Sequence, residues 1–388
     1  MNASLLRDVL EATRRTRSGR LTEATALLQD ALKGHAGPSA TPASGRREPP
    51  TIDAVAEPAG TDTVNGTARV TWPAGVEPAP LPQALRDFIG KATGGSRANA
   101  PRPPEGARFL SATYADAAGS RPYKLYVPAS YRGAAVPLVV MLHGCTQSPD
   151  DFAAGTRMNE AAEERGFLVA YPQQTSAANN QKCWNWFSVA DQGRDRGEPA
   201  LIAGIAREVM AQYAVDPRRV YVAGLSAGGA AAAIMGSAYP DLFAAVGVHS
   251  GLACGAARDL PSAFAAMQGG AKAGKPARRP VPTIVFHGDR DATVHPSNAD
   301  AVAAHAMPRA GLGRTTREGR VPGGHAYSVT AHAGADGRVA LERWVVHGAG
   351  HAWSGGSPAG SHTDPQGPDA TREMLRFFQG VALDPVKA

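Results

Sequence analysis

Short apolar runs alternate with longer amphipathic stretches from residue 107 to the end of the chain. The runs that predict strands are YKLYV, PLVVMLH, FLVAYP, RVYVAG, AAVGVHS, PTIVFHG and ERWVVHG. Four stretches carry apolar residues at helical spacing: Phe152–Arg165, Pro199–Tyr213, Ala227–Tyr239 and Ala370–Gln379. Continuous apolar strands separated by helices predict an α/β fold, with a mostly parallel central sheet and helices on both of its faces.

The outer strands of this region show a different pattern. The run YKLYV fits an antiparallel edge strand of the sheet. The stretch SVTAHAGADGRVALERWVV places an Asp-Gly loop between two strand-like runs. We therefore expect the last core strand to belong to a β-hairpin.

The N-terminal part of the chain lacks the alternation of strands and helices. Met1–Gly34 has two short apolar faces separated by RSGR, which predicts a hairpin of two short helices. Residues 35–106 are rich in Pro and Ala with little periodicity, which predicts a mostly disordered linker. The α/β domain is then expected to span residues 107–388.

The charge of the chain is modest and evenly spread. The 40 Lys and Arg residues exceed the 34 Asp and Glu residues by six, without a long cationic run, so a nucleic-acid partner is not expected. No stretch of 18 apolar residues occurs, so no transmembrane segment is expected. The N-terminus lacks the uninterrupted apolar stretch of a secretory signal peptide, which predicts a cytoplasmic protein.

The three cysteines, Cys145, Cys183 and Cys254, are too few for a disulfide scaffold. Their spacings match no zinc site, and no metal is expected. Cys145 and Cys183 both follow predicted strands at the same end of the sheet, where a bridge would fasten two neighbouring loops. The sequence leaves this bridge open, because thiols stay reduced in the cytoplasm.

Ser226 is the first candidate for chemistry, in the stretch GLSAGGAAAAIMG. A G-x-S-x-G pattern is expected by chance roughly 0.3 times in a chain this rich in glycine, so the pattern alone is weak. Its context is stronger, because Ser226 follows the predicted strand RVYVAG and precedes a helix that begins with small residues. This arrangement is typical of the nucleophile elbow of α/β-hydrolases, whereas the alternative is a glycine-rich crossover turn.

A nucleophilic serine needs an acid and a base that follow it in the chain. The next strong strand end, TIVFHGDRDATV, offers Asp289 and Asp291. We expect Asp291 to be the acid and Asp289 to cap the loop.

The base is predicted to be His351. It lies in HGAGHAWSGG, a glycine-rich loop that directly follows the last strand and can bring the imidazole over Ser226. His347, which is still on the strand, and His362 are the competing histidines.

The tetrahedral intermediate of acyl transfer needs two hydrogen-bond donors. One is expected to be the N–H of Ala227, the residue after the nucleophile. The loop in VVMLHGCTQS, which follows an early strand, is expected to supply the other through the N–H of Cys145. The Cys145 thiol itself is not needed for this role.

Five separated motifs, LHGCTQ, CWNWF, GLSAGG, HGDRDATV and GHAWSGG, occur in this order in the chain. Over roughly Arg121–Gly380 they resemble the catalytic domain of short-chain-length polyhydroxyalkanoate (poly-3-hydroxybutyrate) depolymerases and related esterases. The resemblance implies the α/β-hydrolase fold and hydrolysis of carboxylic esters without a metal or cofactor. Carried over motif by motif, it matches the same residues to the triad and the oxyanion hole: Ser226, Asp291, His351, Cys145 and Ala227.

Three tryptophans, Trp184, Trp186 and Trp353, lie in or beside the motif loops. Tryptophans beside an ester site can wall an acyl pocket or bind a polymer surface, so all three are candidate substrate-binding residues. Packing in the core is the alternative for each of them.

The sequence thus predicts a serine esterase that acts on poly(3-hydroxybutyrate) or its oligomers. The alternatives are a feruloyl or acetylxylan esterase, a broad polyesterase, or an interaction scaffold with an inactive hydrolase domain. Secreted members of the resembled family make an extracellular location the alternative to the cytoplasm. The apolar faces of Met1–Gly34 are expected to dock on the chain's own domain, a partner, a second subunit or a polymer surface.

Overall fold

The computed structural model describes residues 103–271, 277–307 and 311–383. The predicted helical hairpin at residues 1–34, and the predicted linker up to residue 102, lie outside the described residues.

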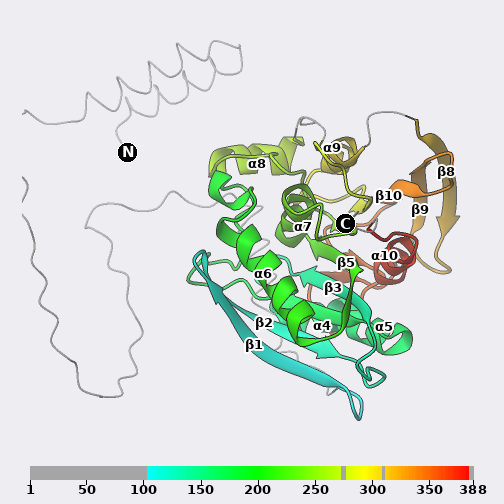
Figure 1. The fold of residues 1–388 in the computed structure, drawn as a ribbon. Helices are drawn as coiled ribbons and strands as arrows, with labels where there is room; N and C mark the ends of the chain where they lie inside the picture. Colours follow the sequence, from blue (N-terminus) through cyan, green and yellow to red (C-terminus); the bar gives the residue numbers. More distant parts are fainter. Residues whose placement is uncertain (1–102, 272–276, 308–310, 384–388) are drawn as a thin grey trace, which may run out of the picture. The chain divides into compact units, whose positions relative to one another are not determined.

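A ten-stranded sheet forms the centre of the described part of the chain, in the order β1-β2-β4-β3-β5-β6-β7-β10-β9-β8 (Figure 1). The strands are β1 (Arg108–Asp116), β2 (Gly119–Val127), β3 (Val136–Leu142), β4 (Leu168–Pro172), β5 (Val215–Leu225), β6 (Ala245–His249), β7 (Thr283–Gly288), β8 (Gly313–Arg320), β9 (Ala326–Ala333) and β10 (Val339–Val346). The six strands from β4 to β10 along this order run parallel, and antiparallel strands flank them on both sides. The mostly parallel sheet expected from the sequence is confirmed.

The two outer parts of the sheet differ in how well the sequence predicted them. The run YKLYV lies in β2, which is antiparallel to β4 as expected. It is not the edge strand, because β1 pairs with its other side and forms the edge. The hairpin expected at the last core strand is present, because β9 pairs with β10 in antiparallel register. Beyond it, β8 forms an additional edge with mostly exposed side chains, so its residues carry no apolar pattern that predicts a strand.

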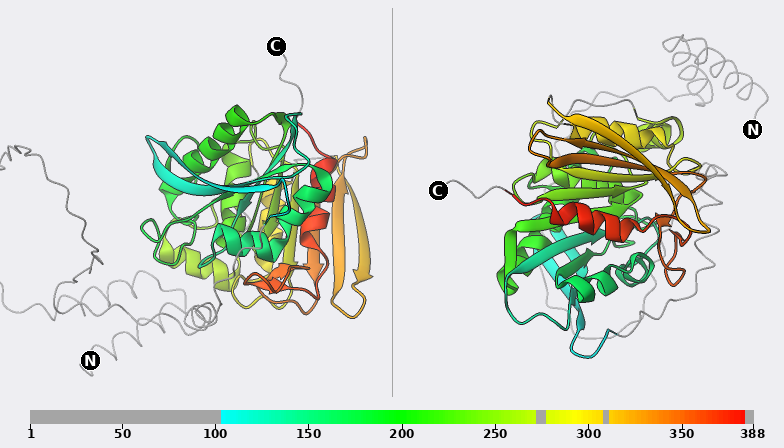
Figure 2. Two further views of the ribbon diagram at one scale, coloured as in Figure 1. Left: turned by 90° about the horizontal axis from the view of Figure 1, so that it is seen from below. Right: turned by 90° about the vertical axis from the view of Figure 1, so that its right-hand side faces the viewer.

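Helices cover both faces of the sheet (Figure 2). They are α4 (Pro149–Thr156), α5 (Met158–Arg165), α6 (Gly197–Gln212), α7 (Ala227–Ala238), α8 (Leu260–Gly269), α9 (Ser297–Ala306) and α10 (Ala370–Gln379), with a short 3-10 helix η1 (Val189–Asp191). Apolar residues of α6, α7, α8 and α9 form one core cluster with one face of the strands. Apolar residues of α4, α5 and α10 form a second cluster with the other face.

The side chains of β3 show how one strand serves both clusters. Val140 packs in the cluster with α6 and α7, and its neighbour Val139 packs in the cluster with α5 and α10. Since successive side chains of a strand point to opposite faces, a strand buried on both faces is apolar throughout. This explains why the central strands appear in the sequence as continuous apolar runs.

One helix prediction is wrong in detail. The stretch Phe152–Arg165 forms two helices, α4 and α5, because Arg157 between them has a left-handed backbone with φ of 56°. The Arg157 guanidinium donates to the Gly355 carbonyl and to the Asp369 carboxylate, which holds the break against the C-terminal part of the chain. The tertiary contacts of one side chain therefore interrupt a continuous helical pattern.

Candidate active site

Ser226 occupies the single-residue turn between β5 and α7. Its backbone is strained, with φ of 58° and ψ of −119°, a conformation that residues other than glycine seldom adopt. The Ser226 N–H donates to the His249 carbonyl at 2.9 Å, which ties the turn to the end of β6. This is the geometry of a nucleophile elbow.

Two glycines around Ser226 are required by close packing. A Cβ atom on Gly224 would lie 2.3 Å from the Gly228 carbonyl oxygen, and one on Gly228 would lie 2.0 Å from the Leu142 carbonyl oxygen. Both distances are far below van der Waals contact, so only glycine lets α7 begin this close to β3 and β5. The elbow of Ser226 therefore depends on the glycines that also made its sequence pattern statistically weak.

Asp291 lies in the loop after β7 and is 5% exposed. Its Oδ1 atom accepts the backbone N–H groups of Thr293 and Val294, both at 2.9 Å. Its Oδ2 atom lies 2.7 Å from Nδ1 of His351. Burial by itself raises the pKa of Asp291, but hydrogen bonds from His287 and His351 outweigh it and hold the pKa well below its ordinary value.

The loop that carries His351 is fastened to the loop that carries the elbow. Nε2 of His249 accepts the N–H of Ser354 at 3.0 Å, three residues after His351, while the backbone carbonyl of His249 accepts the N–H of Ser226. Burial lowers the pKa of His249 to about 3, which keeps Nε2 available as an acceptor. The predicted base and the predicted nucleophile are thus anchored to the same buried residue.

Asp289 and His347, the alternatives weighed from the sequence, form a separate pair. Oδ2 of Asp289 lies 2.9 Å from Nδ1 of His347, and Oδ1 accepts the N–H of Gly348 at 2.7 Å. Ser328 extends the pair, with its Oγ 2.8 Å from Nε2 of His347. Ser328 lies in the regular ladder of β9, paired on both sides, so it has no elbow. Asp289 therefore caps the loop as expected.

His362, the third candidate histidine, is half-buried. Its backbone carbonyl accepts the Trp353 N–H at 2.7 Å, within the segment that follows His351. Burial lowers the pKa of the His362 imidazole.

The predicted oxyanion donors lie beside Ser226. Ala227 is the first residue of α7, where backbone N–H groups have no acceptor within the helix. Cys145 lies in the loop after β3, and both residues line the same cleft as Ser226. The loop is held by the N–H of Gly144, which donates to Gln147 Oε1 at 2.8 Å, and by the N–H of Thr146, which donates to the Gln181 carbonyl at 2.6 Å.

A disulfide joins Cys145 to Cys183, which confirms the bridge that the sequence left open. Cys254 is the free cysteine. The bridge fastens the loop of the predicted oxyanion donor to the segment that carries Asn179, Gln181 and Trp186, all of which line the cleft.

The cleft at Ser226 is open to solvent and mainly apolar, with an empty volume of about 1170 Å³ that includes the solvent at its mouth. Its apolar walls are formed by Trp186, Phe187, Ala227, Leu252, Leu260, Ala263, Phe264, Met267, Ala292 and Val294. Four of these residues belong to α8, which the sequence analysis did not predict. A signal for this helix was present, because Asp259 and Ser262 form a capping box around Leu260 and Pro261.

The three candidate tryptophans have different surroundings. Trp186 lines the cleft, in keeping with the expected role. Trp184 and Trp353 are 0% and 1% exposed and do not line it, so their expected contact with substrate is corrected to packing in the core. Nε1 of Trp184 donates to the His143 carbonyl, and Nε1 of Trp353 donates to Thr371 Oγ1, so each indole is satisfied internally.

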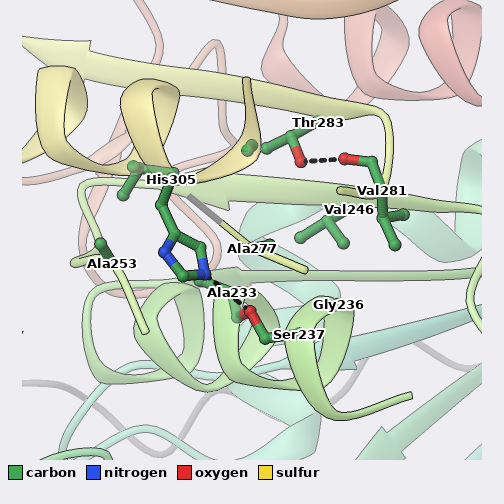
Figure 3. Close-up of a pocket in the computed structure, with 11 residues that line it drawn as sticks. Ala233, Gly236, Ser237, Val246, Ala253, Ala277, Val281, Thr283 and His305 are labelled. Carbon is green, nitrogen blue, oxygen red and sulfur yellow. Dashed lines mark hydrogen bonds between the residues drawn. The ribbon is translucent and has the colours of Figure 1, made fainter. Parts of the chain in front are cut away.

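A smaller cavity of about 330 Å³ lies between α7, α9 and the strands β6 and β7 (Figure 3). Oγ of Ser237 lies 2.9 Å from Nε2 of His305 in its wall. Ser237 is in the last turns of α7, where the backbone is helical, and it shares no wall with the cleft at Ser226. This cavity is therefore separate from the candidate active site.

Two features are absent from residues 103–271, 277–307 and 311–383. Among these residues, no three His, Cys, Asp or Glu side chains are grouped so that they could hold a metal ion. None of the described helices has the length and apolar character needed to cross a membrane.

The sheet order, the elbow at Ser226 and the buried aspartate–histidine pair define an α/β-hydrolase fold with a serine-hydrolase type of site. Residues 121–325, just over half of the chain, match the family described as esterase PHB depolymerase. The chain belongs to this family of carboxylic ester hydrolases. Ser226 and Asp291 lie within the matched residues, and His351 lies beyond them.

Individual relatives agree with this membership. The chain is 35% identical over 228 residues to poly(3-hydroxyalkanoate) depolymerase C of Paucimonas lemoignei, which covers 55% of this chain and 54% of that protein. It is 31% identical over 184 residues to feruloyl esterase B of Thermothelomyces thermophilus, covering 42% of this chain and 62% of that protein. The chain thus spans about half the length of the curated depolymerases it matches. The structure of an acetyl xylan esterase from Aspergillus awamori has the same fold, with a TM-score of 0.52 at 18% identity, covering 71% of this chain and 99% of that one.

Proposed function

We propose that the protein is a serine esterase in which Ser226 is the nucleophile, His351 the general base and Asp291 the acid. The observation that carries this proposal is the strained elbow of Ser226 in the lining of an apolar cleft. His249 ties this elbow to the loop of the buried Asp291–His351 pair.

The proposed reaction is a two-step acyl transfer. His351 takes the proton of Ser226 as Oγ attacks the ester carbonyl, and Asp291 holds Nδ1–H of the imidazole and stabilises the imidazolium that forms. The N–H groups of Ala227 and Cys145 bind the oxyanion. The alcohol then leaves with a proton from His351, and water attacks the acyl-enzyme with His351 acting again as base.

The apolar cleft favours a substrate with an apolar acyl part, and we propose poly(3-hydroxybutyrate) or its oligomers. The family membership and the depolymerase relatives support this choice. The second candidate is a feruloyl or acetylxylan esterase, or a broad polyesterase. Relatives named feruloyl and acetylxylan esterases support the first two of these activities. Phe187 and Phe264 in the cleft wall can contact an aromatic acyl group as well as an aliphatic one.

A hydrolysis panel tests the activity and the substrate together. It compares amorphous poly(3-hydroxybutyrate), hydroxybutyrate oligomers, p-nitrophenyl esters and methyl ferulate, with Ser226→Ala as the inactive control. We expect the hydroxybutyrate substrates to be cleaved with the highest kcat/KM. A higher kcat/KM for methyl ferulate would favour the second candidate, a feruloyl or acetylxylan esterase. Failure of a fluorophosphonate probe to label Ser226 in the folded protein would favour an inactive scaffold.

The N-terminal segment, Met1–Pro104, is proposed to serve location or binding and not chemistry, because every proposed catalytic group lies between Cys145 and His351. The two apolar faces predicted for Met1–Gly34 would dock on the domain itself, a partner, a second subunit or polymer. Deleting Met1–Pro104 is expected to leave hydrolysis of a soluble p-nitrophenyl ester within a few-fold, while binding to polymer particles or self-association falls. A folded truncated protein without soluble-ester activity would contradict this division.

The disulfide also bears on the location of the protein. Disulfides persist in oxidising compartments, so the Cys145–Cys183 bridge supports the extracellular alternative over the cytoplasmic expectation. Counting thiols in denaturant on protein from cytoplasmic and exported fractions tests this proposal: one thiol per chain in the exported fraction supports it, and three contradict it.

A further inference from the structure

The buried carboxylate of Asp291 contacts a second histidine in addition to His351. Nε2 of His287, near the end of β7, lies 3.3 Å from Asp291 Oδ2, the same oxygen that His351 Nδ1 approaches at 2.7 Å. Together with the N–H groups of Thr293 and Val294 on Oδ1, four donors surround the carboxylate. Four donors match the acceptor sites of an ionised carboxylate.

The hydrogen-bond partner of His287 fixes which ring nitrogen carries the proton. Nε2 of His287 also lies 2.8 Å from the Val294 carbonyl oxygen. A carbonyl only accepts, so Nε2 carries a hydrogen. Its nearest acceptor is the Val294 carbonyl, and Asp291 Oδ2 is a second, more distant acceptor at 3.3 Å. His287 therefore acts as a donor toward the carboxylate.

The other ring nitrogen of His287 shows what this residue contributes. His287 is 2% exposed, and its Nδ1 is buried without a hydrogen-bond partner among the described residues. A buried polar atom without a partner costs stability, and an apolar side chain on β7 would avoid that cost. The polar interactions of the ring are thus concentrated on the Nε2 side, which faces Asp291 and Val294.

Val294 links His287 to the substrate cleft as well. Ala292, Thr293 and Val294 form part of the cleft wall, and this short segment is held by Asp291 Oδ1 from one side and by His287 from the other. A single side chain thereby fixes both the orientation of the carboxylate and the position of the wall.

We propose that His287 is a positioning residue of the active site: its Nε2–H holds the Asp291 carboxylate in the orientation that His351 Nδ1 requires. The proposal rests on the proposed function for its kinetic consequence, and on geometry alone for its effect on the Asp291–His351 hydrogen bond. In the reaction, a carboxylate that is already fixed need not reorganise when His351 becomes an imidazolium.

A matched pair of amide substitutions tests the position of the donor. In His287→Gln the side-chain amide reaches the position of Nε2, whereas in His287→Asn it reaches only the position of Nδ1. We expect His287→Gln to keep kcat on a p-nitrophenyl ester within about 3-fold, and His287→Asn to lower kcat by about 10-fold or more, the effect of losing one charge-assisted hydrogen bond. KM is expected to change less than kcat. Equal kcat values for two folded variants would overturn the proposal.

Proton and nitrogen NMR separates this proposal from the proposed function. The low-field Nδ1–H resonance of His351, assigned by its loss in His351→Ala, is expected to persist in His287→Gln and to shift or broaden in His287→Asn. Ring nitrogen shifts of the wild-type protein are expected to show hydrogen on Nε2 of His287, and hydrogen on Nδ1 alone would overturn the proposal even if neither variant folds. An inactive wild-type chain, or an active Ser226→Ala variant, would refute the proposed function without deciding the role of His287.

Discussion

Two aspartate–histidine pairs lie at the carboxyl ends of the adjacent parallel strands β7 and β10, and they differ most in their surroundings. Side chains of the Asp291–His351 pair are 0% and 7% exposed, whereas those of the Asp289–His347 pair are 38% and 42% exposed. Both have hydrogen-bonding distances below 3 Å. Distance alone therefore does not distinguish the pair proposed as catalytic from the exposed one.

The serine associated with each pair differs in its backbone conformation and in its surroundings. Ser328, beside His347, has the extended backbone of a regular strand, whereas Ser226 has a strained turn at the start of a helix and lines an apolar cleft. A nucleophile needs donors for the oxyanion and a place for the substrate, and the expected donors and the apolar cleft both lie beside Ser226. Burial strengthens the interaction of Asp291 with His351, while water screens that of Asp289 with His347.

The largest effect in this comparison is expected when each of the two serines is replaced by alanine. Ser226→Ala is expected to lower kcat for a p-nitrophenyl ester by about 10⁶-fold, leaving the catalysis that binding and the oxyanion hole supply. Ser328→Ala is the matched control and is expected to keep wild-type kcat. Fluorophosphonate labelling mapped by mass spectrometry should find Ser226 in both wild type and Ser328→Ala. Label on Ser328 would mean that the exposed relay is also reactive.

The second test replaces each of the two aspartates by asparagine. Asp291→Asn is expected to lower kcat by roughly 10⁴-fold, because the amide favours the wrong tautomer of His351. Asp289→Asn is expected to change kcat by less than about 3-fold, since this side chain only caps a loop. Steady-state kinetics at pH 8 on both purified variants measures the ratio. The reverse ranking would move the acid to Asp289.

The third test uses pH to probe His249, the buried histidine that anchors both loops of the site. Burial lowers the pKa of His249 to about 3, below its unfolded value near 6.5, so the unfolded chain binds more protons between these values. Stability is therefore full above pH 6.5 and falls as the pH drops, by on the order of 3 kcal/mol at pH 4 from this residue.

Urea unfolding from pH 8 to pH 4 measures this slope. His249→Gln, whose amide oxygen can accept the Ser354 N–H, is expected to flatten it. An identical slope in wild type and His249→Gln would show that His249 does not contribute.

The smallest effect is expected for the stability of the exposed pair. Asp289→Asn keeps an oxygen that can accept the Gly348 N–H but removes the charge facing His347, so it should cost less than about 1 kcal/mol. The remaining loss should vanish in about 1 M salt, where exposed charges are screened. Chemical unfolding at low and high salt measures both values. A loss above about 2 kcal/mol would contradict the contrast with the buried pair.

The sequence by itself determined the α/β architecture and the pairing of Asp291 with His351. Continuous apolar runs such as PLVVMLH identify strands because burial on both faces removes polar positions. The glycines around Ser226 predict the elbow because they are needed where backbones approach closely. These signals are local, so they can be interpreted without knowing which elements pack together. The catalytic roles of these residues remain predictions for the experiments above.

Tertiary structure alone decided which residues surround the reacting groups. Trp184 and Trp186 are two positions apart and both are buried, yet only Trp186 lines the cleft. The indole of Trp184 instead donates to the His143 carbonyl beside the 145–183 disulfide. Tertiary structure likewise decided three other features: the cleft wall from α8, the break at Arg157 and the contact of His287 with Asp291. Such contacts depend on packing and on which side of a buried ring meets a partner, and hydrophobic periodicity carries no information about either.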